Sequence, residues 1–534
     1  MLSRLYSAMN RGLVLGARFA PAAALVGAVL LAGSDLWAQA DDFATKVQQN
    51  WHQWRGPNGD GSAPNSNPPT EWNETKNMKW KVELPGKGSG TPVIWEDRIY
   101  LMSAIEMESA TPAVETPAED SPKLGSDRPR GSTESNSDQS RDTPPRPRTS
   151  EIRGTDGTER PSGNERARGE TGGANQERTQ EGQEQGREGR RQGRGGRGEQ
   201  RPATKHQFIV LCLDRESGKE IWRKTMIEAV PHEAGHGTNT FASASLVVDG
   251  QRIYAHFGSR GFYCLDMQGE VLWEKDLGLM RTRNGFGEGG SPSVYGDTVV
   301  IPWDHEGDSM MVALDAKTGE EKWKVERDER TTWSTPLITP FGDKVQVVAN
   351  GSVVRSYDLA TGQLIWECGG QVGNPIPSPV RYEDQVVCMT GYQGYAIVSM
   401  SLDSQGDITK TSKVAWSGGG AAPYVPSPVL YEGQLYFVKS NNPVMVIRNV
   451  KTGEVVLDET RLPQMRAIYA SPVAAGGKIY FCSREGVVVV IKHGDSGEVL
   501  AINEMGETID ASPAIVGDQL FIRGDKHLFC IAAP

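Results

Sequence analysis

The chain has 534 residues and a formal net charge of −11, with 57 Lys and Arg against 68 Asp and Glu. This length allows several domains or one large repeat fold, since a typical domain has about 100–150 residues. The mean hydropathy is too polar for a protein with many membrane spans, and six cysteines are too few for a disulfide-rich scaffold. The acidic charge balance also disfavours nucleic acid as a partner.

Residues 1–40 have the pattern of a secretory signal peptide. Three arginines, Arg4, Arg11 and Arg18, precede the apolar run 20–33. Ala38 and Ala40 follow the run with the spacing of a cleavage site. The apolar run is short for a membrane span, and no cysteine that could carry a lipid precedes Cys212. We therefore expect a periplasmic or secreted protein with no transmembrane span after cleavage. The alternative is an uncleaved N-terminal anchor.

Residues 106–204 form a second distinct segment, rich in Arg, Gly and Glu. It contains 19 acidic and 17 basic residues and no aromatic residue. Such a composition cannot bury enough apolar surface to offset the entropy of ordering, so the sequence predicts a disordered insertion. Its end, 187–201, holds six Arg and resembles an Arg/Gly nucleic-acid-binding run. A solvated linker is the favoured interpretation, because no aromatic residues interleave for base stacking.

The remainder, 41–105 and 205–534, consists of one unit repeated eight times. Each unit has four short apolar segments separated by turns, and from the second unit onward it recurs every 41–49 residues. Four strands per ~45 residues is the arithmetic of a propeller blade. The units open at the pairs Thr91-Pro92, Ala244-Ser245, Ser291-Pro292, Thr335-Pro336, Ser378-Pro379, Ser427-Pro428, Ser471-Pro472 and Ser512-Pro513.

A turn with the pattern Asp-x-x-Thr/Ser-Gly-x-x-x-Trp precedes the outer strand of several units. Glycine supplies the positive φ that the hairpin requires, and the Asp side chain can accept a hydrogen bond from the turn backbone. The flat Trp face is expected to pack against the adjacent unit. The residues in these positions are Asp214, Gly218, Trp222, Asp266, Gly269, Trp273, Asp315, Gly319, Trp323, Asp358, Gly362 and Trp366, with Trp416 in the fifth unit.

The eighth unit has three strands and then the chain stops. The missing outer strand is found upstream, because 78–82 contains Trp80 and reads like the other Trp-bearing outer strands. The sequence therefore predicts an all-β, eight-bladed β-propeller whose ring is closed by an N-terminal strand in the last blade. In the same scheme, 41–105 supplies this closing strand and starts the first blade, and 106–204 interrupts that blade.

The repeated Asp–Gly–Trp turns resemble the pyrroloquinoline-quinone (PQQ) repeat. This resemblance covers about 51–104 and 206–534, and it implies a superfamily of eight-bladed propellers that includes quinoprotein dehydrogenases and the outer-membrane assembly protein BamB. The run 51–57, Trp-His-Gln-Trp-Arg-Gly-Pro, further resembles exported BamB-like proteins of planctomycete-type bacteria. Fold alone does not set function.

Two functions follow from the resemblance. The first is an exported, non-catalytic scaffold that binds protein or peptide partners at the cell envelope, as a monomeric propeller. The second is an extracytoplasmic oxidoreductase that binds PQQ and Ca²⁺. The vicinal Cys-Cys pair common in the dehydrogenases does not occur here, and apart from the insertion in the first blade the units are mostly minimal, whereas the dehydrogenases usually carry long blade insertions. Both points favour the scaffold. A binder of polysaccharide or of the envelope surface is a third class.

Two loop clusters are candidate sites. In a propeller blade, the loops between the second and third strands share one face with the connections between blades; we call this the upper face. The opposite, lower face carries the tight hairpins. His232 and His236 fall on the connection between the first two blades, and Asp304, His305 and Glu306 fall on the loop of the third. These side chains can bind a transition metal or Ca²⁺. Their spacing matches no defined metal signature, so hydrogen bonds that organise the loops are the alternative.

Overall fold

The computed structural model describes residues 43, 45–108 and 204–534, which belong to one compact unit. The predicted signal peptide and, apart from its ends, the predicted insertion lie outside the described residues. Among the residues described, no helix is both long and apolar enough to cross a membrane.

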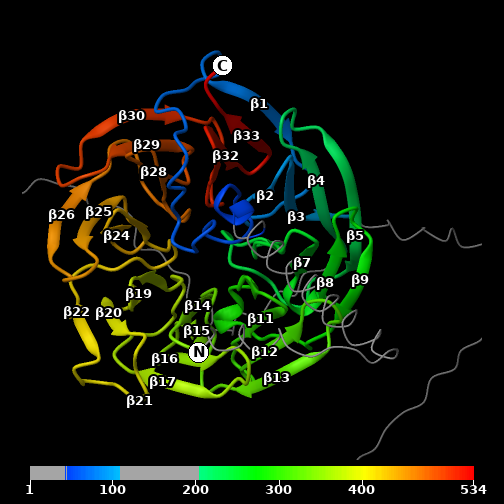
Figure 1. Ribbon diagram of the computed structural model, residues 1–534. Helices are drawn as coiled ribbons and strands as arrows, with labels where there is room; N and C mark the ends of the chain where they lie inside the picture. The colour runs from blue at the N-terminus through cyan, green and yellow to red at the C-terminus, as the bar shows by residue number, and fades with distance from the viewer. Residues whose placement is uncertain (1–42, 44, 109–203) are drawn as a thin grey trace, which may run out of the picture. The chain divides into compact units, whose positions relative to one another are not determined.

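Eight antiparallel sheets stand around a ring, as the repeat predicts (Figure 1). We number them blades 1–8 in chain order. Their strands are, for blade 1, β2 (Val93–Trp95), β3 (Arg98–Glu106), β4 (His206–Asp214) and β5 (Glu220–Ala229); for blade 2, β6 (Val247–Val248), β7 (Arg252–His256), β8 (Phe262–Asp266) and β9 (Val271–Lys275); for blade 3, β10 (Ser293–Tyr295), β11 (Thr298–Trp303), β12 (Met310–Asp315) and β13 (Glu321–Glu326); and for blade 4, β14 (Leu337–Phe341), β15 (Lys344–Ala349), β16 (Val354–Asp358) and β17 (Leu364–Cys368).

The second half of the ring has the same organisation. Its strands are, for blade 5, β18 (Val380–Tyr382), β19 (Gln385–Thr390), β20 (Ala396–Ser401) and β22 (Val414–Gly418); for blade 6, β23 (Val429–Tyr431), β24 (Gln434–Val438), β25 (Val444–Asn449) and β26 (Val455–Arg461); for blade 7, β27 (Val473–Ala475), β28 (Lys478–Cys482), β29 (Val487–Lys492) and β30 (Val499–Glu504); and for blade 8, β31 (Ala514–Val516), β32 (Gln519–Arg523) and β33 (His527–Ile531). The short strand β21 (Gly406–Asp407) extends blade 4, and two 3₁₀ turns, η1 (Gly258–Arg260) and η2 (Arg283–Gly285), lie in loops.

The strand β1 (Met78–Glu83) completes blade 8. It pairs antiparallel with β33, with Trp80 opposite Cys530 and Val82 opposite Leu528. The first and the last of the described strands therefore lie in one blade (Figure 1). This confirms the predicted closure, which leaves no blade with a missing strand.

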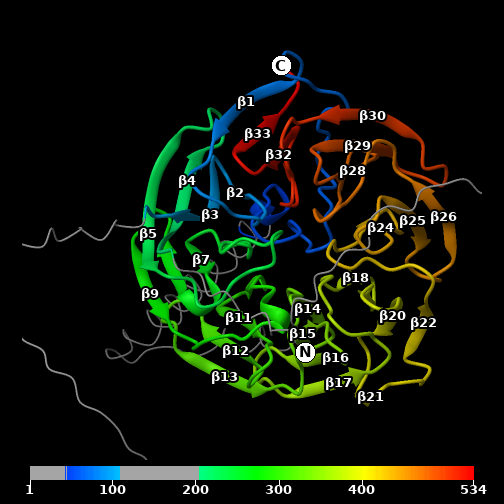
Figure 2. The ribbon, with the colours of Figure 1, turned by 180° about the vertical axis from the view of Figure 1, so that it is seen from behind.

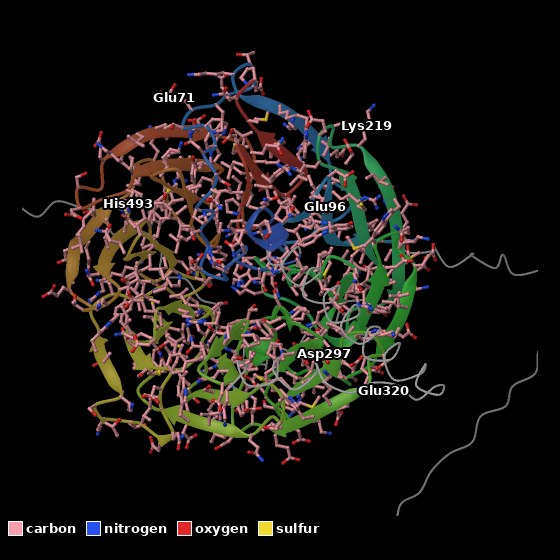
Figure 3. All side chains as sticks on the ribbon, viewed as in Figure 1. Glu71, Glu96, Lys219, Asp297, Glu320 and His493 are labelled. Carbon is pink, nitrogen blue, oxygen red and sulfur yellow. The ribbon has the colours of Figure 1, made fainter. Side chains whose placement is uncertain are left out.

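The position of each strand in its blade decides its burial. Third strands are covered on both sides by neighbouring blades; in β29, for example, Val487 to Ile491 are all buried. Outer strands face solvent on one side and alternate in exposure, as in β1. In Figure 3, Lys219 and Glu320, from turns before outer strands, lie at the periphery of the ring, whereas Glu96 and Asp297 lie further in.

The repeated turn keeps its spacing because its glycine contacts the Trp of the preceding blade. A Cβ placed on Gly319 of blade 3 would lie 2.7 Å from the Trp273 ring of blade 2, so the indole lies flat on the glycine. Trp273 also donates from Nε1 to the carbonyl of Ala316, at 3.3 Å. Gly218, Gly269, Gly362 and Gly453 meet Trp80, Trp222, Trp323 and Trp416 in the same way. The predicted packing of Trp on the adjacent blade is therefore what links blade to blade.

Residues 51–63, which precede the closing strand, cross the middle of the ring (Figures 1 and 2). We call them the crossing segment. Arg55 is buried at its centre, where its two terminal nitrogens donate to the carbonyls of Pro472 (2.7 Å) and Pro428 (2.6 Å). The cation thus joins blades 6 and 7 through their innermost strands.

His52 of the crossing segment gives the fold a dependence on pH. Burial lowers its pKa from 6.5 to about 4, so the unfolded chain takes up a proton before the folded chain does as the pH falls below 6.5. The stability contributed by neutral His52 is present above pH 6.5 and is lost toward pH 4, by about 1.4 kcal/mol per pH unit and about 3 kcal/mol in total. Urea unfolding at pH 7, 5.5 and 4.5 is expected to show a shallower pH slope for His52→Leu than for the wild type. His236→Gln is the control and is expected to keep the wild-type slope. Equal pH slopes of the unfolding free energy in His52→Leu and the wild type would contradict the role given to His52.

Candidate functional site

The five predicted metal ligands lie on the upper face but do not form one centre. Within the described ranges, no group of three or more His, Cys, Asp or Glu side chains is arranged to hold a metal ion. Asp304 instead forms a buried ion pair with Arg327 at 2.8 Å, in which the guanidinium also reaches the second carboxylate oxygen at 3.1 Å. Thr332 donates to the same carboxylate at 2.8 Å. Hydrogen bonds therefore use the oxygens that a metal would need.

The other members of this set organise loops. The Nδ1 atom of His305 lies 3.2 Å from the backbone nitrogens of both Arg281 and Gly307, and burial lowers the His305 pKa. Glu306 accepts a hydrogen bond from Thr331 at 3.0 Å. The Nδ1 atom of His236 lies 2.8 Å from the Thr238 hydroxyl. These contacts are those of the alternative interpretation, in which the side chains hold the loops in place.

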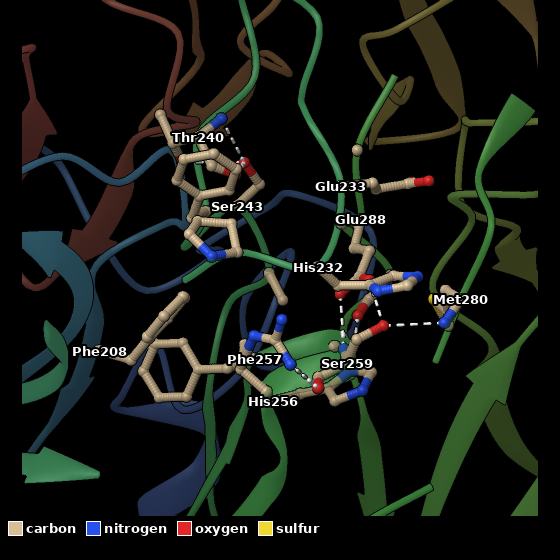
Figure 4. A pocket seen from close by; sticks show the side chains of 18 of the residues that line it. Phe208, His232, Glu233, Thr240, Ser243, His256, Phe257, Ser259, Met280 and Glu288 are labelled. Carbon is tan, nitrogen blue, oxygen red and sulfur yellow. Dashed lines mark hydrogen bonds between the residues drawn. The ribbon is translucent and has the colours of Figure 1, made fainter. Parts of the chain in front are cut away.

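His232 belongs to a small pocket between blades 1 and 2, which the close-up shows (Figure 4). The pocket has a volume of about 40 Å³, close to the size of a water molecule. Ser259 donates from its backbone nitrogen and its hydroxyl to the two carboxylate oxygens of Glu288. Burial raises the Glu288 pKa to about 7. The neighbouring Glu233 accepts from Thr282, so both carboxylates are fixed by hydroxyl groups.

A cavity on the axis of the ring opens on the upper face. It has a volume of about 390 Å³, within the range of small-ligand pockets. Trp54 of the crossing segment lines this cavity and also lines a groove on the lower face. Its Nε1 donates to the Ser378 hydroxyl at 3.0 Å, which fixes the indole to blade 5.

A belt of hydroxyl groups surrounds this central cavity. In six blades, the hydroxyl of the Ser or Thr that opens the blade accepts a hydrogen bond from the backbone nitrogen of the equivalent residue in the preceding blade. Six of these bonds, of 2.8–3.3 Å, join Thr91 to Ser245, Ser245 to Ser291, Ser291 to Thr335, Ser378 to Ser427, Ser427 to Ser471, and Ser471 to Ser512. Between blades 4 and 5, the Ser378 hydroxyl accepts from Trp54 instead.

Above the belt the lining is aromatic. Tyr392 and Tyr424 stack with ring centroids 4.8 Å apart, and Phe286, Trp333 and Tyr469 complete the lining. Asp510 is the one carboxylate among the described residues that line the cavity, and Arg484 pairs with it at 2.7 and 3.1 Å. The arrangement offers flat apolar faces and neutral hydrogen-bonding groups.

The same lining tests the cavity as a site for PQQ. Aromatic faces and the volume suit a planar ring, but PQQ carries three carboxylates. No Lys or Arg is among the described residues that line the cavity, and the nearby Arg484 is already paired with the one carboxylate of the lining, Asp510. No metal-ligand group accompanies it in the described part of the chain. The residues present do not fit a tricarboxylate held with a divalent cation.

Comparison with known proteins agrees with the repeat and the ring. Residues 206–459 match the family model described as outer membrane protein assembly factor BamB. Over this region the chain is similar to the BamB family. The outer membrane protein assembly factor BamB of Yersinia pestis is 25% identical over 174 residues, which are 31% of this chain and 40% of that protein.

This PQQ-repeat propeller is also similar to quinoproteins. Methanol dehydrogenase (cytochrome c) subunit 1 of Methylobacterium organophilum is 31% identical over 153 residues, 24% of this chain and 23% of that protein. The quinohemoprotein alcohol dehydrogenase of Comamonas testosteroni superposes with a TM-score of 0.52 at 10% identity, over 92% of this chain and 84% of that chain. The matched sequence regions span less than half of the Yersinia and Methylobacterium proteins, so they describe the repeat and not a whole relative.

The sequence predicted candidate sites in the loops of the upper face but did not predict the cavity on the axis of the ring. Trp51 is fully buried and bridges to Ile94 of β2, whereas Trp54 reaches the cavity. The signal for the belt was present in the Ser/Thr-Pro pairs, because a position repeated once per blade falls at the same radius of the ring.

Proposed function

We propose that this PQQ-repeat propeller is exported to the cell envelope and acts there as a non-catalytic scaffold. The partner is a protein or peptide segment that inserts into the central cavity of the upper face. Localisation in the envelope rests on the predicted signal peptide and on the similarity to a protein named as an outer membrane assembly factor. The predicted monomeric state is part of this proposal.

The observation that carries the proposal is the chemistry of the central cavity. Six Phe, Tyr and Trp side chains and a belt of neutral hydroxyl groups line it, and its carboxylate is already paired with Arg484. Aromatic residues in a partly enclosed pocket are the usual centres of protein–protein binding energy. Hydroxyl groups and backbone carbonyls at the wall suit the amide groups of a peptide.

A quinoprotein oxidoreductase is the second candidate. It is supported by the 31% identity to a methanol dehydrogenase subunit over part of the chain and by the position of the cavity on the ring axis. The lack of basic residues in the described lining argues against it. For that reason we rank it below the scaffold.

Titration with PQQ and CaCl₂ separates these two functions. The purified protein is expected to show no saturable change in PQQ absorbance, no thermal shift, and no dye reduction with methanol or ethanol as electron donor. A stoichiometric absorbance change together with alcohol-dependent dye reduction would establish the oxidoreductase and reject the scaffold. A quinoprotein dehydrogenase that is assayed in parallel serves as the positive control.

Site-specific photocrosslinking tests the partner. A photoreactive residue in place of Tyr392 is expected to crosslink one envelope protein in intact cells of the native host, whereas the same residue at the exposed Val499 of blade 7 is not. Adding Trp333→Ala removes an aromatic wall of the cavity and is expected to lower the yield about 30-fold, as for a 2 kcal/mol hot spot. Equal yields from positions 392 and 499 would reject the cavity as the binding site.

A further inference from the structure

We propose that the lower face binds an extended, uncharged peptide of a partner protein, which bridges the innermost strands of blades 3, 4 and 5. Among their described lining residues, this groove and the central cavity of the upper face share only Trp54, Thr335 and Ser378, so the two sites are formed by different parts of the ring. The inference therefore goes beyond the proposed scaffold function and does not depend on it.

The crossing segment already uses this mode of binding. In blade 1, Trp51 and Ile94 exchange two backbone hydrogen bonds of 3.1 and 2.9 Å. The equivalent residue of blade 2, Val248, donates to His52 at 2.9 Å. All of these bonds go to the third residue after the opening Ser or Thr, whose backbone groups point toward the axis.

Blades 6 and 7 repeat this pattern. Leu430 of blade 6 donates to the carbonyl of Asp60 at 3.1 Å. Ala474 of blade 7 donates to Gly61 at 3.0 Å and accepts from Ala63 at 2.9 Å. The crossing segment thus forms backbone hydrogen bonds with the same inward-facing residue of the innermost strand in four blades.

Blades 3, 4 and 5 present this position unpaired. The equivalent residues are Val294, Ile338 and Arg381, and within the described ranges none of them makes a backbone hydrogen bond across the axis. Their strands are also less covered: β23 and β27 are fully buried, whereas β10, β14 and β18 are partly exposed, with Tyr295 41% exposed. Unpaired inward N–H and C=O groups form a template for an added extended chain.

The space in front of these residues is large enough for a peptide. The lower-face groove has a volume of about 1290 Å³ and runs past the inner strands of blades 3, 4 and 5. The backbone hydrogen bonds of the crossing segment go to blades 1, 2, 6 and 7 (Figure 2), and at blade 4 Gly59 approaches only the side chain of Leu337. Blades 3, 4 and 5 are consecutive, so one chain can bridge all three.

The charges of the groove favour an uncharged peptide. Arg252 pairs with Asp249 at 3.3 Å, and Glu96 pairs with Lys46 at 3.0 Å. Arg381 donates to the Thr339 hydroxyl at 2.6 Å and to a backbone carbonyl. Since these charges already have partners within the chain, the groove gains little from a charged ligand. Side chains of the peptide that alternate toward Val294, Leu337 and Tyr295 would be apolar.

A random 12-residue peptide library displayed on phage is the probe. The immobilised full chain is expected to enrich uncharged peptides with alternating apolar residues. The enriched peptides are then synthesised, and their affinity is measured by fluorescence anisotropy. Ile338→Pro removes the inward N–H without touching a ladder hydrogen bond and is expected to weaken binding at least tenfold. Ile338→Ala keeps the N–H and is the matched control, with a change of less than about threefold.

Two further measurements separate a loss of peptide binding from a failure to fold and from an effect of the upper cavity. Methylation of alternate peptide nitrogens tests the same hydrogen bonds if Ile338→Pro fails to fold, and a loss of at least tenfold is expected. Tyr392→Ala alters the upper cavity and is expected to leave this binding unchanged. Failure to enrich any peptide, equal affinity of methylated and unmethylated peptides, or sensitivity to Tyr392→Ala alone would each overturn the lower-face site. None of these outcomes bears on crosslinking from position 392.

Discussion

Asp304→Asn is expected to destabilise the protein by about 3–5 kcal/mol, because it leaves a buried guanidinium without a counter-ion. The side chains of Arg327 and Asp304 are 0% and 2% exposed, and their two nitrogen–oxygen contacts are 2.8 and 3.1 Å. Arg327 keeps the Tyr357 hydroxyl as a neighbour at 2.7 Å, but a phenol does not balance the charge. The free energy of unfolding in urea measures the effect.

The control is Asp308→Asn in the same loop. Asp308 is exposed, so this change is expected to alter stability by less than about 0.5 kcal/mol. Treatment with EDTA is expected to leave the melting temperature of the wild type unchanged. If EDTA lowers the melting temperature and Asp304→Asn abolishes that response, Asp304 is a metal ligand and the account of it as an ion-pair partner is wrong.

Gly319→Ala is expected to cost about 3 kcal/mol, although it adds one methyl group. The backbone at Gly319 has a φ of +72°, and a Cβ there would lie 2.7 Å from the Trp273 ring of the preceding blade. The positive φ accounts for about 1 kcal/mol and displacement of the indole for about 1–3 kcal/mol. Urea unfolding of the purified variant checks the sum.

Gly342 is a matched control, because its φ is +62° and nothing lies within 4 Å of the added methyl group. Gly342→Ala is therefore expected to cost about 1 kcal/mol, the backbone term alone. Combining Gly319→Ala with Trp273→Ala removes the ring that would collide, so the penalty of Gly319→Ala in that background is expected to approach the Gly342→Ala value. Equal losses of stability from Gly319→Ala and Gly342→Ala in the wild-type background would show that the packing of the Trp273 indole does not require a glycine at position 319.

The fold was predictable because its information is periodic. Each blade repeats the same turn, so Gly319 and Trp273 could be assigned a structural role before their contact was known. The closing role of Trp80 followed from the same pattern. Even so, one member differs: Trp366 donates to Gln346 of its own blade, because β21 pairs alongside it at the place where the next turn would lie.

The candidate site was only partly predictable because it is built from positions that do not repeat. Arg55 binds the carbonyls of Pro428 and Pro472, which are distant in sequence and carry no side-chain signal. Tyr392 and Tyr424 occur on inter-strand loops and connections whose lengths vary. The metal prediction at Asp304 relied on residue type alone, and an arginine at the end of the neighbouring strand turned that carboxylate into half of an ion pair.

The pairing of β1 with β33 has a consequence for how the protein is made. The strand β1 pairs with β33, which is synthesised several hundred residues later, so the ring cannot close until β33 has been made. Contacts of such long sequence separation form slowly, and until then blade 8 lacks its outer strand. Folding of the ring is thus completed only after β33 has been synthesised.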